Sequence, residues 1–220
     1  MEISNLVAAD RALGKHISQC EWNSRLQGLQ DFNTRPIKEK IYRGDNEDPE
    51  RFLKNLASSV PESVKLPIIS YFRGIGFTLD MEEFQIFKVP LSNVEGTRHY
   101  NVEYANYTFT WNVSIIGHGA ASIHEIGLPL HRYFHENPLF NIPYNLIYDI
   151  PENRAVKFNL PATIKEPRNI PFDDSTPKKD NITQVYAASA SFEIKVPMIW
   201  MEQVTPVIEE IEFMAMIVKN

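Results

Sequence analysis

The sequence has a single cysteine, no excess of positive charge and no long apolar run, and each shortage excludes a class of protein. Cys20 can form neither a disulfide within the chain nor a thiolate metal cage. The 22 Lys and Arg against 28 Asp and Glu give a formal net charge of −6, and no basic stripe typical of a nucleic-acid binder is visible. No run of about 18 apolar residues predicts a membrane-spanning helix. The N-terminal residues lack the apolar core of a signal peptide, so we expect a cytoplasmic protein.

What the sequence does contain is enough apolar surface for a core. Of its 220 residues, 43% are hydrophobic and 11% are aromatic, which excludes an intrinsically disordered chain. This length fits one domain over residues 1–220. Residues 1–45 give a weak pattern, with a helix expected around Ser4–Leu13, and we interpret this segment as an extended arm.

Two segments alternate between apolar and polar residues as half-buried strands do. In Tyr104–Gly117 the apolar residues recur at every second position, and the same period runs through Ile182–Val196. Shorter strands are expected at Val64–Gly76, Leu146–Tyr148 and Arg154–Leu160. The segment Val207–Val218 favours a strand, although Pro206 would also suit the start of a helix.

Between the two long strands, Ala120–Glu136 has apolar residues at helical spacing. Gly127 and Pro129 lie inside it and predict a kink or two short helical pieces. Residues 165–181 hold three prolines and many charges without periodicity, which predicts a long exposed loop. Together the segments predict an α+β fold: a twisted, mostly antiparallel sheet with one main helix packed on a face and long projecting loops.

The histidines are the residues with the clearest capacity for chemistry. His131 and His135 are four residues apart and His124 lies seven before His131, so a helix would place all three on roughly one side. A three-ligand metal site is therefore conceivable. The glutamate of an H-E-x-x-H motif is missing, however, and Arg132 next to His131 disfavours a divalent cation. We interpret these histidines as polar residues of an interface, and expect neither a metal nor a cofactor.

No catalytic motif emerges elsewhere. The sequence has no G-x-S-x-G, no P-loop and no G-x-G-x-x-G, and its carboxylate pairs are sequence neighbours, whose side chains point apart. Nothing in the sequence favours Cys20 as a nucleophile. We therefore expect a protein that is not an enzyme.

Three segments carry a resemblance to a known family. They are Leu66–Ile75 (LPIISYFRGI), Tyr104–Ile115 and Ile123–Phe140 (IHEIGLPLHRYFHENPLF). Their order resembles the tail terminator, or tail sheath stabiliser, proteins of contractile-tailed bacteriophages, in which a leucine-proline strand precedes a long aromatic strand and a helix. The residues that match the helix pattern are Ile123, Ile126, Leu128, Pro129, Tyr133, Phe134, Pro138 and Phe140. Gly127 and the residues between Pro129 and Phe134 depart from it. The resemblance covers roughly residues 64–143.

The resemblance implies a structural virion protein that assembles in the host cytoplasm. Such a protein forms a ring, expected to be a hexamer, at the head-proximal end of the tail, where it binds tail tube, tail sheath and neck proteins. DNA would only pass through its lumen, and an acidic wall suits that passage because like charges repel. We expect the subunit contacts on the 120–136 helix and the 165–181 loop, at His124, His131, Arg132, Tyr133, His135, Arg168, Phe172, Asp173, Asp174, Lys178 and Lys179. Two alternatives stay open at this point: another virion component (neck, baseplate or capsid), and a metal-dependent enzyme that uses the 118–135 histidines.

Overall fold

The computed structural model describes residues 5–22, 27–44, 51–52, 65–80, 87–92, 99–149, 154–176 and 185–204. Its helical elements are α1 (Asn5–Ser18), α2 (Gln27–Thr34), α4 (Ala120–Glu136) and the short 3-10 helices η1 (Ile37–Glu39) and η2 (Pro167–Asn169). Its strands are β1 (Ile41–Arg43), β2 (Ile68–Leu79), β3 (Phe87–Ser92), β4 (His99–Gly117), β5 (Leu139–Asp149), β6 (Arg154–Ile164), β7 (Asp173–Asp174) and β8 (Tyr186–Val204).

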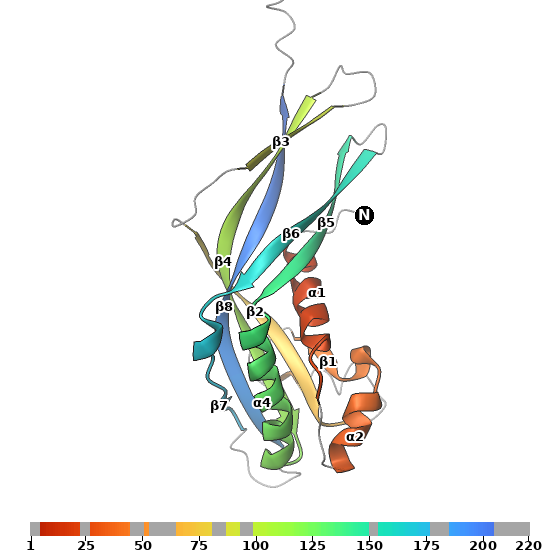
Figure 1. Ribbon diagram of the computed structural model, residues 1–220, viewed down its shortest axis with the longest axis vertical. Helices are drawn as coiled ribbons and strands as arrows, with labels where there is room; N and C mark the ends of the chain where they lie inside the picture. The colour runs from red at the N-terminus through yellow and green to blue at the C-terminus, as the bar shows by residue number, and fades with distance from the viewer. Residues whose placement is uncertain are drawn as a thin grey trace, which may run out of the picture.

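The strands form one sheet in the order β1-β2-β4-β8-β6-β5, with β3 paired to β4 and β7 paired to β8. Every described pair is antiparallel except β1 with β2. The helices α1 and α4 lie against this curled sheet (Figure 1). The predicted α+β class with a mostly antiparallel sheet is therefore confirmed.

A two-stranded ribbon of β4 and β8 runs along most of the molecule (Figure 1). The strands pair without a register shift from His99 opposite Val204 to Gly117 opposite Tyr186. The strand predicted at 104–117 is confirmed, and the one predicted at 182–196 is confirmed from Tyr186, since residues 182–184 lie outside the described residues. Both strands extend farther towards the end of the ribbon that carries β3. Alternation of apolar and polar residues indicates a strand but not where it ends, so the predicted ranges stopped short of His99 on β4 and Val204 on β8.

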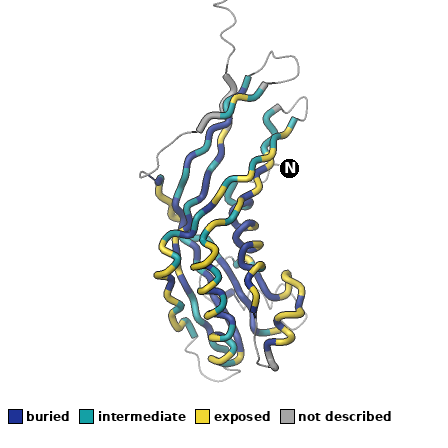
Figure 2. The backbone as a smooth tube through the Cα atoms, in the orientation of Figure 1, coloured by how far each residue is buried: buried dark blue, intermediate teal, exposed yellow. Residues whose placement is uncertain are grey.

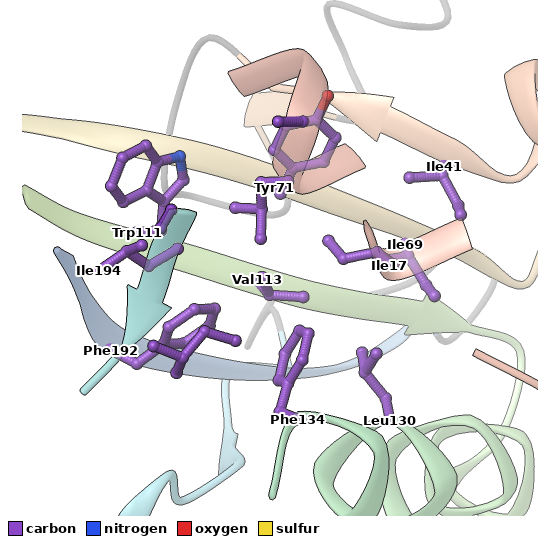
Figure 3. Close-up of a cluster of buried hydrophobic side chains, with 14 of the residues drawn as sticks. Ile17, Ile41, Ile69, Tyr71, Trp111, Val113, Leu130, Phe134, Phe192 and Ile194 are labelled. Carbon is purple, nitrogen blue, oxygen red and sulfur yellow. The ribbon is translucent and has the colours of Figure 1, made fainter. Parts of the chain in front are cut away.

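Near the helices both faces of β4 are buried, since Val113, Ile115 and Ile116 are all fully covered. The odd-numbered residues belong to the main core, where Figure 3 shows Val113 near Phe134 of α4 and Trp111 near Ile194 of β8. Near the other end the even-numbered residues are also inside: Tyr100 packs on Tyr148 of β5 with ring centroids 5.8 Å apart. Two-stranded ribbons twist strongly, so along an unbroken register the even-numbered face also turns towards the interior at this end.

The N-terminal segment is not the extended arm that its weak pattern suggested. Of residues 1–45, those described form α1, α2, η1 and β1, and Leu13, Ile17 and Phe32 are fully buried. Helix α1 contacts β1 and β5, the two outer strands of the sheet order. It thereby covers sheet edges that would otherwise be open to pairing. Alanines and a glycine let this helix pack closely, and these small residues gave only a faint apolar pattern.

Helix α4 is one continuous helix, so the expectation of two short pieces is wrong. Gly119 precedes the helix and Asn137 ends it, and the backbone N–H of Asn137 donates to the carbonyl of Tyr133. Pro129 lies inside and has no N–H to offer the preceding turn. Leu130 and Phe134 face the sheet (Figure 3), Ile126 is fully buried as well, and this packing stabilises the helix despite the proline.

The predicted 165–181 loop is more ordered than expected over its described residues. Residues 167–169 form η2, and Asp173–Asp174 form β7 against Ser189 and Ala188 of β8. Residues 177–181, with Lys178 and Lys179, and the strand predicted at 207–218 lie outside the described residues. The strands predicted at 64–76, 146–148 and 154–160 are present as parts of β2, β5 and β6. No described helix is long and apolar enough to cross a membrane.

Candidate functional site

An open groove of about 630 Å³ lies beside α4 and is here called the α4 groove. Helix α4 forms one wall, and the segment 170–176 with the start of β8 forms the other. The helical wall is built from positions three and four apart, which lie on one face of a helix. The lining residues are Ile115, Ala120, Ile123, His124, Gly127, Leu128, His131, Ile170, Phe172, Asp174, Thr176, Tyr186, Ala187 and Ala188.

Both walls of the α4 groove are held by close contacts. A Cβ at Gly127 would lie 3.3 Å from Ile115 Cδ1, so the glycine allows α4 to approach β4. On the opposite wall, the hydroxyl of Ser189 is 2.7 Å from those of Ser114 and Ser175. The backbone N–H of Thr176 donates to Asp174 Oδ1 at 2.9 Å. The 170–176 wall is thus tied to the sheet by hydrogen bonds.

Leu128 stands on a ridge between the α4 groove and a second groove. Its side chain is 71% exposed although it belongs to an otherwise well-packed helix. The second hollow, about 580 Å³, is here called the α1–α4 groove and is lined by Gln19, Cys20, Glu21, Leu128, Pro129, Arg132, Tyr133 and Glu136. An exposed large apolar side chain between two grooves is typical of a protein contact site.

The α1–α4 groove is more polar and offers no activated nucleophile. Arg132 Nε donates to Glu136 Oε1 at 2.7 Å across its exposed rim, and this hydrogen bond raises the pKa of Arg132. Burial raises the pKa of the Cys20 thiol to about 12, so the thiol stays protonated near neutral pH. Because the Cys20 thiol is protonated, this groove is suited to binding a partner and offers no thiolate nucleophile at Cys20.

The structure brings some of the predicted interface residues together and separates others. His124, His131, Phe172 and Asp174 come from two segments and line the α4 groove. Arg132 and Tyr133 line the α1–α4 groove. His135, Arg168 and Asp173 are exposed outside both lining sets. Sequence reasoning missed Leu128 as a surface residue, although its place four residues after His124 put it on the same helical face.

The three helix histidines do not form a metal centre. Among the described residues, no group of three or more His, Cys, Asp or Glu side chains could hold a metal ion. His124 and His131 line the α4 groove, whereas His135 lies at the exposed end of the helix. The spacing correctly placed all three histidines on one side of α4, but His135 lies too far along the helix to line the groove.

His16, which the sequence did not single out, is buried where α1 meets α4 and β5. Its Nε2 lies 2.9 Å from the carbonyl of Asn137, and its Nδ1 lies 3.3 Å from the hydroxyl of Tyr133. Its ring stacks on Phe140 with centroids 4.9 Å apart. Burial lowers the pKa of His16, outweighing the hydrogen bonds that raise it. This histidine joins three elements of the core.

The chemistry available at the α4 groove is that of recognition. Its surface is mainly apolar, with imidazoles and a carboxylate at the rim. Concave apolar surfaces of this kind bind extended apolar segments or one face of a helix. The geometry therefore supports a protein contact site more directly than a reaction centre.

The sequence was compared with protein-family models and with curated proteins, and neither comparison finds a match.

Proposed function

We propose that this protein is a structural component of a virion. It forms a ring that terminates a contractile phage tail at its head-proximal end, where it binds tube, sheath and neck proteins. The proposal starts from the resemblance carried by residues 64–143. The proposed role is structural and involves no catalysis.

One observation of the structure supports it above the others. His124 and His131 on α4 and Phe172 and Asp174 on the following segment were expected at subunit contacts, and they line one open apolar groove. The exposed Leu128 beside them adds an apolar anchor, a kind of residue that contributes to binding when a partner covers it. A groove assembled from two segments favours a contact with another protein chain.

The shape is also suited to assembly. The ribbon of β4 and β8 carries the sheet well beyond the helices (Figure 1), and Figure 2 shows intermediate and exposed residues along the β5–β6 hairpin. An elongated subunit with surface on several sides can touch neighbours and axial partners at once. Closed rings use such head-to-tail contacts, each pairing two different surfaces.

The proposal predicts that charge placed on the ridge blocks assembly. Leu128→Asp should weaken association with copies, tubes or sheath by at least about 2 kcal/mol, or roughly thirtyfold, because an apolar anchor is replaced by a carboxylate. The assay is light scattering of the purified protein, alone and with tail tubes and sheath. Assembly only on tubes would agree with the proposal.

The matched control is Leu139→Asp on β5, because Leu139 is also an exposed leucine but lines neither groove. We expect it to assemble like the unchanged protein. If Leu128→Asp assembles as well as this control, the α4 groove is not the contact site. A protein that never associates with itself, tubes or sheath contradicts the proposed function itself.

A further inference from the structure

An apolar patch remains exposed on the ribbon, far along β8 from the α4 groove. Here called the ribbon patch, it surrounds a hollow of about 360 Å³ lined by Asn5, Leu6, Arg73, Ile75, Phe77, Tyr107, Phe109, Met198, Ile199 and Trp200. Ile75 is 95% exposed, Phe77 63% and Trp200 37%. Three large apolar side chains at one hollow are a surface that water does not favour.

The twist of the ribbon explains why this patch is left open. Phe109 and Trp111 continue along their face of β4 into Tyr107, and Ile194 continues on β8 into Met198 and Trp200. In the half near the helices this face is covered. In the other half the opposite face turns inward, and the Tyr144 hydroxyl of β5 donates to the carbonyl of Pro197.

Local structure brings further apolar groups to the patch. The register of β2 against β4 shifts between Arg73 and Phe77, at the sequence Gly74-Ile75-Gly76, which leaves Ile75 on the outside of a bulge. The Phe77 ring then meets Tyr107 and Phe109, with centroids 6.0 Å and 5.8 Å away. Backbone pairing accounts for the bulge, but nothing among the described residues covers its isoleucine.

We propose that the C-terminal segment of the same chain, residues 207–218, covers the ribbon patch. Its sequence is VIEEIEFMAMIV, in which Ile211, Phe213, Ala215 and Ile217 alternate and the last six residues carry no charge. A segment of this composition is an aggregation hazard when water surrounds it. Packing it on the patch removes two apolar surfaces from water at once.

The reach of the chain favours the same molecule over a second copy. Trp200 lies only four residues before Val204, the end of β8, which is about 13 Å along a strand. The far side of the patch, at the level of Phe109 and Ile194, is about 33 Å from Val204 by the same measure. Residues 205–220 can span about 50 Å when extended, and attachment to β8 gives them an effective concentration near the millimolar range.

Tryptophan fluorescence tests this inference directly. Of the three tryptophans, Trp22 and Trp111 are buried, so a soluble quencher such as acrylamide reports on Trp200. In the full chain we expect little quenching. The variant Ile211→Ser/Phe213→Ser/Ile217→Ser should raise the quenchable share of the emission to about one third, the share of one tryptophan in three. The control Glu209→Gln/Glu210→Gln changes charged neighbours and should leave quenching unchanged.

A cross-linking experiment changes only one residue of the segment, so its result does not depend on whether the triple serine variant folds. The buried Cys20 can stay, and Phe77→Cys is paired with Ile217→Cys, which lies 13 residues after Val204 and reaches about 43 Å when the chain is extended. We expect disulfides within single chains, at a yield independent of protein concentration. Lys157→Cys, exposed on β6, replaces Phe77→Cys in the control and should react little.

Either experiment can overturn the inference. Equal quenching in the full chain and the serine variant, or equal cross-linking from Phe77→Cys and Lys157→Cys, shows that the segment does not cover the patch. Disulfides only between chains, with Trp200 protection that grows with protein concentration, assign the patch to a second copy instead. None of these results depends on the ring proposed above, because monomers suffice for each.

Discussion

Single residues decide how α1 fits against the rest of the molecule. His16 is buried between aromatic rings, with Nε2 facing the Asn137 carbonyl and Nδ1 facing the Tyr133 hydroxyl. We assign the neutral ring with its proton on Nε2, because a carbonyl accepts and the tyrosine hydroxyl can donate to Nδ1. The hydrogen bonds of His16 with the Asn137 carbonyl and with Gln19 favour the charged ring, but burial outweighs them because that charge would be poorly hydrated.

The His16 environment predicts a pH dependence of stability. Burial lowers the pKa of His16 in the folded chain below its ordinary value of 6.5, so the unfolded chain binds more protons in the window between the two. The free energy of unfolding should therefore fall as the pH drops below about 6.5, and level off below the folded pKa. Urea unfolding between pH 8 and pH 5, compared with His16→Gln, isolates this contribution. The same pH slope in both proteins would contradict it.

Gly14 is a second residue that α1 requires. A Cβ there would overlap the Tyr71 hydroxyl and lie 2.9 Å from the ring carbon Cζ. Gly14→Ala should lower the free energy of unfolding by about 2 kcal/mol, because overpacking outweighs the gain of about 1 kcal/mol that alanine brings to a helix.

Chemical denaturation checks this prediction, with Gly76→Ala as the control because no atom lies within 4 Å of its added Cβ. The control should change stability by less than about 0.5 kcal/mol. Adding Tyr71→Phe to Gly14→Ala should restore part of the loss, since the hydroxyl is the nearest clashing group. Unchanged stability in Gly14→Ala would show that Tyr71 moves aside freely.

At the scale of elements, α1 is fastened to the sheet by a buried carboxylate. Asp10 Oδ2 lies 2.7 Å from Arg43 Nη2 on β1, and Asp10 Oδ1 lies 3.0 Å from Arg73 Nε on β2. The Arg73 guanidinium also lies over the rings of Phe109 and Trp111. One acidic residue thus connects a helix, an edge strand and an inner strand.

Removing this carboxylate should loosen the three elements together. Asp10→Ala is expected to cost about 3 kcal/mol, at the low end for a buried ion pair because the Arg43 side chain is half exposed. The control is Glu193→Ala, whose pair with Lys165 is exposed on both sides and should contribute less than about 1 kcal/mol. Thermal or urea unfolding measures both. An equal loss of unfolding free energy in the two variants would show that the Asp10 ion pairs contribute no more than an exposed pair does.

At the scale of the whole molecule, the sequence predicted the sheet better than the way it is covered. The alternation in 104–117 and 182–196 was strong because each strand places one face in the main core. It could not show that the even-numbered face of β4 also turns inward at Tyr100 and Val102, because the twist of a ribbon does not change the period of two. The helix expected around Ser4–Leu13 is present as part of α1, but residues 1–45 were interpreted as an extended arm because small residues such as Ala9, Ala12 and Gly14 pack closely without a strong apolar pattern.

The candidate site was predicted in part for the same reason. Spacing placed His124 and His131 on one helical face, whereas residues 165–181 were expected only as an exposed loop. The fold alone shows that Phe172 and Asp174 meet that face, because the contact joins segments about 45 residues apart. Leu128 escaped notice because an exposed leucine looks like a core residue until its neighbours are known.

The central claim is that this molecule acts through contacts with other proteins at the head-proximal end of a tail. Electron microscopy of the assembled particle, with the chain located by a bound antibody or a fused tag, tests this claim most directly. The account predicts a ring of this protein between the last layer of the tail tube and the neck. Its location in the baseplate or the capsid, or its absence from the particle, would contradict the account.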